Sequence, residues 1–155
     1  MFARLAQVMA MLAMLAILVS PVAAQQASFP QAPLPDKPFA EHHLVIQLSD
    51  AAPDKQALAI SVAYNMLTFY GPDRIAIVVV AFGPGIDLLR AGNANRPRVD
   101  SLIAQGVQFD VCMNTVDTLE REGQRVDLNP KAVKVQVGVA RILTLVEKGY
   151  TLVRP

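Results

Sequence analysis

The sequence predicts an α/β fold, a three-layer sandwich in which a mainly parallel sheet of about five strands carries helices on both faces. Two observations lead to this prediction. Short β-branched runs alternate with helix-like segments throughout residues 43–155, which is typical of βαβ units. In the run RIAIVVVAF (residues 74–82) every residue after Arg74 is apolar, as expected of a parallel strand covered on both sides. Right-handed crossovers would connect such strands.

The first half of the domain contains two predicted strands and three helical segments. The run HLVIQLSD (residues 43–50) predicts the first strand, and apolar side chains at helical spacing predict a helix over residues 54–70, which Gly71 ends. Residues 74–82 form the second strand. GPGIDLLRAG then predicts a turn with a short helix. Residues 96–106, with a proline near their start and a glycine at their end, predict a further helix.

The second half continues the alternation. VQFDVC (residues 107–112) predicts the third strand, and the polar segment MNTVDTLEREG predicts a helix directly after it. The loop VDLNP precedes a fourth predicted strand, KAVKVQV (residues 131–137). Residues 138–148 carry apolar side chains at helical spacing, and YTLVRP (residues 150–155) predicts a last short strand. The sequence shows no internal repeat and no second domain.

Residues 1–24 predict a secretory signal peptide. Arg4 precedes an apolar stretch of 12 residues (8–19), and the small residues Val22 and Ala24 suit cleavage after Ala24. Because a bilayer-spanning helix needs roughly 20 residues, no stable membrane span is expected after cleavage. The sequence therefore predicts a periplasmic or secreted protein, with an uncleaved N-terminal anchor as the alternative.

The composition after cleavage excludes one class of partner. Residues 25–42 contain four prolines and no apolar periodicity, so they predict a Pro-rich tether ahead of the domain at residues 43–155. Of the chain's 14 Lys and Arg, one lies in residues 1–24, which leaves 13 cations against 13 acids. A neutral chain without Trp or a Lys/Arg run lacks the electrostatic footprint of nucleic-acid binding, so no nucleic-acid partner is expected.

Motifs for cofactor and metal chemistry are missing as well. The glycine loop at residues 83–85 follows the second strand rather than the first, and Leu88 stands where a dinucleotide loop needs its third glycine. His42 and His43 are the only histidines, and neighbours on an extended chain point to opposite sides. The sequence contains no Gly-x-Ser-x-Gly elbow. We therefore expect no cofactor and no metal, and neither a metalloenzyme nor a nucleotide-dependent enzyme.

Three loops at the carboxyl ends of the strands form the candidate site, because ligands of open parallel sheets bind at this edge. The loops contain Ser49 and Asp50 after the first strand, Gly83, Pro84 and Gly85 after the second, and Cys112, Asn114 and Thr115 after the third.

Cys112 is the only cysteine, so it cannot form a disulfide within the chain. In an exported protein such a residue is buried, paired between chains, or reactive. It precedes a predicted helix whose free N–H groups and dipole would favour a thiolate, and Asn114 and Thr115 could cap that helix. Asp110 lies on the same side of the strand and would disfavour the thiolate. An inert, buried cysteine is the alternative.

The runs VVAFGPGIDLL, GVQFDVCMNTVDTL and AVKVQVGVARILTLVEKGYTLVRP resemble the DsrE/DsrF-like family, specifically its small exported members. The resemblance covers residues 43–155, and its most specific parts are the Gly-Pro-Gly loop, the Cys-x-Asn-Thr segment and the Gly-Tyr ending with a terminal proline. It implies a small α/β sandwich that assembles into homo-oligomers. It also implies that Cys112 carries sulfur, accepting sulfane sulfur from a donor as a persulfide and passing it to an acceptor protein.

Two functional hypotheses follow. In the first, the protein handles sulfur in the manner of a sulfurtransferase. Cys112 carries the sulfur, Gly83, Gly85 and Asn114 shape its pocket, and Ser49 and Asp50 line the neighbouring loop. In the second, the protein is a non-catalytic module that binds a small ligand or forms oligomeric contacts, and Cys112 is structural.

Overall fold

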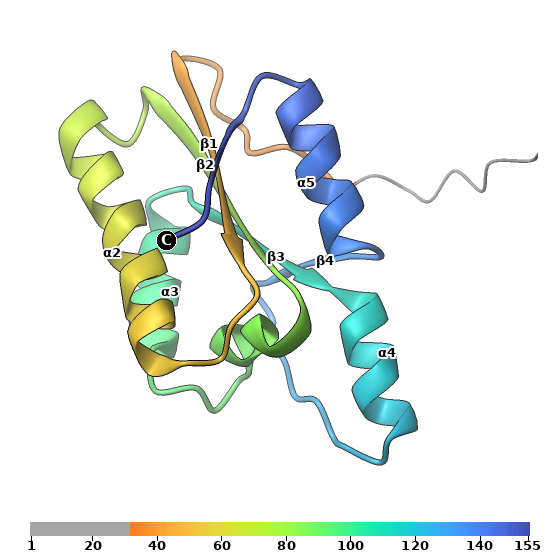
Figure 1. Ribbon diagram of the computed structural model, residues 1–155. Coiled ribbons are helices and arrows are strands. Elements are labelled where there is room, and N and C mark those ends of the chain that lie inside the picture. Colours follow the sequence, from red (N-terminus) through yellow and green to blue (C-terminus); the bar gives the residue numbers. More distant parts are fainter. Residues whose placement is uncertain (1–31) are drawn as a thin grey trace, which may run out of the picture.

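The computed structural model describes residues 32–155; the expected signal peptide and the first part of the tether lie outside them. It contains an open sheet of five parallel strands in the order β4-β3-β2-β1-β5, which confirms the predicted fold class (Figure 1). The strands are β1 (His42–Leu48), β2 (Ile75–Ala81), β3 (Gln108–Cys112), β4 (Val133–Val135) and β5 (Thr151–Val153). The helices are α2 (Pro53–Tyr70), the 3-10 helix η1 (Gly83–Leu89), α3 (Arg96–Ala104), α4 (Met113–Arg121) and α5 (Gly138–Glu147).

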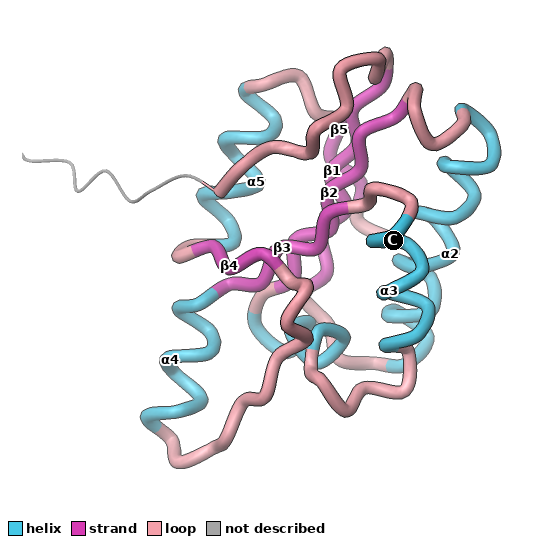
Figure 2. The backbone as a smooth tube through the Cα atoms, turned by 180° about the vertical axis from the view of Figure 1, so that it is seen from behind, coloured by secondary structure: helices cyan, strands magenta, loops and turns pink. Residues whose placement is uncertain are grey.

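Helices cover both faces of the sheet, and the two faces are covered unequally (Figures 1 and 2). All seven residues of β2 are buried, as its uninterrupted apolar run predicts. One face packs against α2, η1 and α3 in the larger core cluster, which includes Ile60 and Leu102. The other face packs against α5 through a smaller cluster that includes Ile142 and Leu145. Among residues 32–155, no helix is both long and apolar enough to cross a bilayer.

The main departure from the predicted elements is the length of β4. Seven residues were expected, and the strand has three, paired with residues 110–112 of β3. The pairing stops after Val135 because β3 ends at Cys112 and α4 begins at Met113. Ahead of Val133, residues 131–132 form a turn and a bend instead of continuing the strand. β4 is therefore a short edge strand.

Residues 32–41, called the strap below, run along the α5 side of the domain to the start of β1 (Figure 2). Lys37 attaches the strap to the C-terminal ends of α2 and α3. Its Nζ donates to the backbone carbonyls of Pro72 and Gln105 at 2.8 Å and 3.1 Å. These carbonyls follow the C-termini of α2 and α3, where a cation is favoured by the helix dipoles.

A buried ion pair connects β3, α5 and the strap. The Arg141 Nε donates to the Asp110 carboxylate at 2.7 Å, and the two side chains are 5% and 0% exposed. The Gln108 amide donates to the other carboxylate oxygen at 2.7 Å. The remaining guanidinium nitrogens donate to the carbonyls of Ala32 and Pro33 at 2.9 Å and 2.8 Å. Burial nevertheless raises the pKa of Asp110, against the lowering influence of Gln108 and Arg141.

We expect Arg141→Met to lower the free energy of unfolding by ~3–5 kcal/mol at neutral pH, because it leaves a buried carboxylate without its cation. Removing the cation raises the pKa of Asp110 further, so the native variant binds a proton at higher pH than its unfolded chain does. The loss should therefore shrink as the pH falls. Urea unfolding of wild type and variant at neutral and mildly acidic pH measures this change in stability.

The matched control is the Arg141→Met/Asp110→Asn double variant, which has no carboxylate to protonate at this site. It should recover part of the stability at neutral pH, and its deficit should not shrink on acidification. An Arg141→Met variant whose deficit is the same at neutral and mildly acidic pH would contradict the assignment.

Candidate functional site

The loops after β1 and β2 are in direct contact at the carboxyl edge of the sheet. A Cβ on Gly85 would collide with the Leu48 carbonyl and would lie 3.0 Å from the Ser49 Cα, so only glycine permits this approach. The Asp50 carboxylate accepts a hydrogen bond at 2.7 Å from the backbone N–H two residues later. Ser49, Asp50 and Gly85 thus shape the backbone of this edge.

Cys112 is buried at this edge, where α5 begins. Only 6% of the residue is exposed. Its Sγ accepts a hydrogen bond from the Gly138 N–H at 3.2 Å and lies 3.8 Å from the Gln136 carbonyl, toward which the thiol can donate. The thiol makes no capping bond to α4, although it directly precedes that helix. The amide donor at the sulfur therefore belongs to the first residue of α5, and not to α4 as the sequence suggested.

Asn114 and Thr115 connect α4 to the loops on either side instead of capping it. The Asn114 N–H donates to the Gln136 carbonyl at 3.1 Å, and the Gln136 side chain donates to the Asn114 Oδ1 at 2.7 Å. On the other side, the Gly83 N–H donates to the Thr115 Oγ1 at 3.0 Å. The first turn of α4 therefore holds both the segment that covers Cys112, residues 136–138, and the glycine loop.

Asp110 does not act on the thiol as an isolated charge. It lies two residues before Cys112 on the same face of β3, as expected, but its carboxylate is compensated by Arg141. Within residues 32–155, no group of three or more His, Cys, Asp or Glu side chains is arranged to hold a metal ion.

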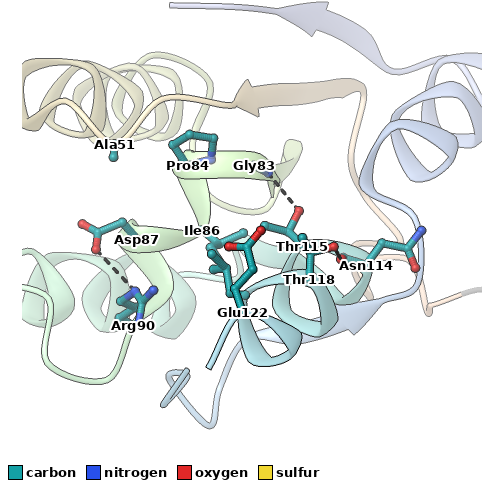
Figure 3. A pocket seen from close by; sticks show the side chains of 11 residues that line it. Ala51, Gly83, Pro84, Ile86, Asp87, Arg90, Asn114, Thr115, Thr118 and Glu122 are labelled. Atoms are coloured by element: carbon teal, nitrogen blue, oxygen red, sulfur yellow. Dashed lines mark hydrogen bonds and ion pairs between the residues drawn. The ribbon is translucent and has the colours of Figure 1, made fainter. Parts of the chain in front are cut away.

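A cavity of about 600 Å³ opens at the same edge, between η1 and α4 (Figure 3). Its volume falls in the range of small-molecule sites. The lining residues are Ala51, Gly83, Pro84, Ile86, Asp87, Arg90, Asn114, Thr115, Thr118, Leu119 and Glu122. Four of these, Gly83, Pro84, Asn114 and Thr115, were predicted from the sequence.

The lining residues that sequence reasoning missed come mainly from η1 and α4. Thr118, Leu119 and Glu122 follow Thr115 at spacings of three, four and seven residues, so they share one helix face. The spacing in the sequence was therefore enough to predict that these three side chains lie on the same side of the helix as Thr115. Asp87, by contrast, depends on tertiary contacts. Its carboxylate accepts bonds from the side chains of Gln56 and Asn93, both at 3.0 Å.

The thiol and the cavity lie on opposite sides of the sheet. Phe109 and Val111 of β3 point into the core beneath α2 and α3, so the alternation of the strand turns Cys112 toward α5. Cys112, Ser49, Asp50 and Gly85 do not line the cavity. Some of the predicted residues therefore lie around the buried thiol and others line the open cavity. Asn114 lines the cavity and is hydrogen-bonded to Gln136, which lies beside the thiol.

Comparison with known proteins adds a structural relative. Neither a protein-family model nor a curated protein matches this sequence. The structure is similar to that of a protein of unknown function, MTH1491, from Methanobacterium thermoautotrophicum, with a TM-score of 0.67 and 28% sequence identity. The match covers 74% of this chain and 100% of that chain.

We expect Gly138→Ala to destabilise the fold by ~1–3 kcal/mol, because the added methyl overpacks a filled site. The new Cβ would lie 3.0 Å from the Phe82 Cβ and 3.1 Å from the Cys112 Cβ. Gly92→Ala is the control, since a Cβ at Gly92 meets nothing within 4 Å. Urea unfolding compares the two variants, and equal midpoints would contradict the close packing of α5 on Cys112.

Proposed function

We propose that this chain is an exported, DsrE/DsrF-like protein that handles sulfane sulfur at Cys112. The supporting observation is the Gly138 N–H, which donates to the Cys112 Sγ at 3.2 Å. A backbone donor at a helix N-terminus stabilises negative charge on sulfur, and the thiolate is the form that attacks another sulfur atom. The resemblance in sequence to the DsrE/DsrF-like family also supports sulfur handling. The predicted signal peptide supports a periplasmic or secreted location.

The proposed reaction moves one sulfur atom between two thiols. The Cys112 thiolate attacks the outer sulfur of a donor persulfide, R–S–SH. A new S–S bond forms on Cys112, the donor's S–S bond breaks, and the donor leaves as the thiolate R–S⁻, which takes a proton from solvent. An acceptor thiolate then attacks the outer sulfur of the Cys112 persulfide in the same way and regenerates the Cys112 thiolate. There is no net oxidation.

Burial of Cys112 makes access part of the mechanism. The sulfur is covered by residues 136–138, and Asn114 holds this cover through two hydrogen bonds to Gln136. A donor reaches the sulfur only when the cover moves away from β3. We therefore expect slow reaction with bulky reagents and faster reaction with small sulfur donors.

The test is intact-mass spectrometry of the folded full-length protein after incubation with inorganic polysulfide. We expect an adduct of roughly 32 Da, one sulfur atom, that dithiothreitol removes. Cys112→Ser should show no adduct, because the chain contains no other cysteine. A folded protein that stays unmodified, while the same chain reacts after unfolding in urea, would exclude sulfur handling at Cys112.

A second candidate function, binding of a small ligand, is favoured by the cavity between η1 and α4. The cavity has apolar walls from Ile86 and Leu119 and carries charged side chains of Asp87, Arg90 and Glu122. In this case the protein is a binding module in which Cys112 is structural.

An apolar fluorescent dye such as anilinonaphthalene sulfonate tests whether the cavity binds ligands. We expect Thr118→Trp to fill the cavity and to reduce dye fluorescence several-fold. Thr68→Trp is the matched control: Thr68 donates to a carbonyl four residues earlier, as Thr118 does, but lies on α2 outside the cavity lining. Equal fluorescence from the two variants would count against ligand binding in the cavity.

A further inference from the structure

Helix α5 is apolar on two sides. Its inner side packs on the sheet through Ile142 and Leu145. On another side, Val139, Leu143 and Val146 are 58%, 59% and 41% exposed. They follow one another at spacings of four and three residues, so they form a continuous stripe. A helix that is apolar on more than one side is normally buried on each of them.

Leu152 of β5 extends this stripe across the sheet edge. The register pairs Leu152 with Val45, which belongs to the core cluster beneath α5. Leu152 therefore points to the α5 side, and it is 37% exposed. Helix α5 also contacts β5. We call Val139, Leu143, Val146 and Leu152 the α5–β5 surface.

We propose that the α5–β5 surface binds the same surface of a second copy of this chain, and that this contact controls access to Cys112. The four side chains expose roughly 300 Å² of largely apolar surface, a size at which such patches are often functional. A stable interface covers about 800 Å² per partner, with an apolar centre and a polar rim. The α5–β5 surface supplies that centre. It contains no charged side chain, so two copies meet there without repulsion.

The charges beside the surface favour an antiparallel arrangement of the two helices. Glu147 is exposed and lies four residues after Leu143, on the same side of α5. A two-fold axis at Leu143 places Glu147 opposite Val139 of the second copy, in the first turn of its α5. An acid is favoured beside a helix N-terminus. A parallel pairing would place two copies of Glu147 against each other.

The contact reaches the thiol through one peptide unit. Val139 directly follows Gly138, whose N–H donates to the Cys112 Sγ. A second copy held on Val139 restrains the first turn of α5, and with it the cover over Cys112. Dissociation frees this turn, so the thiol reacts faster in the single chain than in the pair. Neither the contact between the two copies nor the change in the reaction rate of the thiol requires that the protein transfers sulfur.

The test is sedimentation of the full-length protein over a concentration series, with Leu143→Glu as the disruptive variant. We expect the average mass to fall by half relative to wild type, while the circular dichroism spectrum is unchanged. Phe69→Glu is the matched control, because Phe69 is a 79% exposed apolar residue on α2. All variants share the same N-terminal region, so association through that region affects them equally.

Alkylation of Cys112, the only thiol, gives the second readout. We expect the rate to rise several-fold in Leu143→Glu and to stay at the wild-type value in Phe69→Glu. Equal masses for wild type, Leu143→Glu and Phe69→Glu would overturn the proposed contact. A reduced mass with an unchanged alkylation rate would overturn its control of the thiol. Neither outcome depends on whether the protein transfers sulfur.

Discussion

The buried pair of Asp110 and Arg141 is the interaction on which the geometry of the functional edge depends. It fixes α5 over β3, since the two side chains come from these two elements and are almost fully excluded from solvent. Gly138 lies three residues before Arg141, so the same contact sets the position of the first turn of α5 over Cys112. The strap adds carbonyl acceptors for the remaining guanidinium donors. A displaced Arg141 would therefore loosen the strap, α5 and the cover of the thiol together.

The first turn of α4 connects the two halves of this edge. Asn114 holds the cover on the α5 side, and Thr115 holds the glycine loop on the cavity side. The two residues are neighbours in a helix that begins directly after Cys112. A ligand that shifts α4 within the cavity would also pull on Gln136, and so on the cover. The two proposed functions are therefore not mutually exclusive, because the first turn of α4 contacts both the cavity and the segment that covers the thiol.

The sequence was sufficient to predict the sheet, and insufficient to predict the contacts at its carboxyl edge. A short, uninterrupted apolar run such as residues 75–82 is typical of a strand buried on both faces, so the parallel sheet was predictable. The hydrogen bond from Gly138 to Cys112 was not predictable, because Gly138 is 26 residues away in the sequence and approaches the sulfur only after α5 packs on the sheet. Arg141 likewise sits in a helical segment whose polar residues suggest a solvated face. Its burial depends on Asp110 and on the strap, which no local pattern encodes.

Burial and the backbone donor together define what reactivity at Cys112 requires. The Gly138 N–H donates to the sulfur, and the same contact holds the first turn of α5 against it. Gly138 has no side chain, and a Cβ there would already press on Phe82 and Cys112. The persulfide proposed above would therefore require the first turn of α5 to move. Asn114, Arg141 and the proposed second copy all act on that turn, so the proposed sulfur chemistry would depend on movement of residues 136–138.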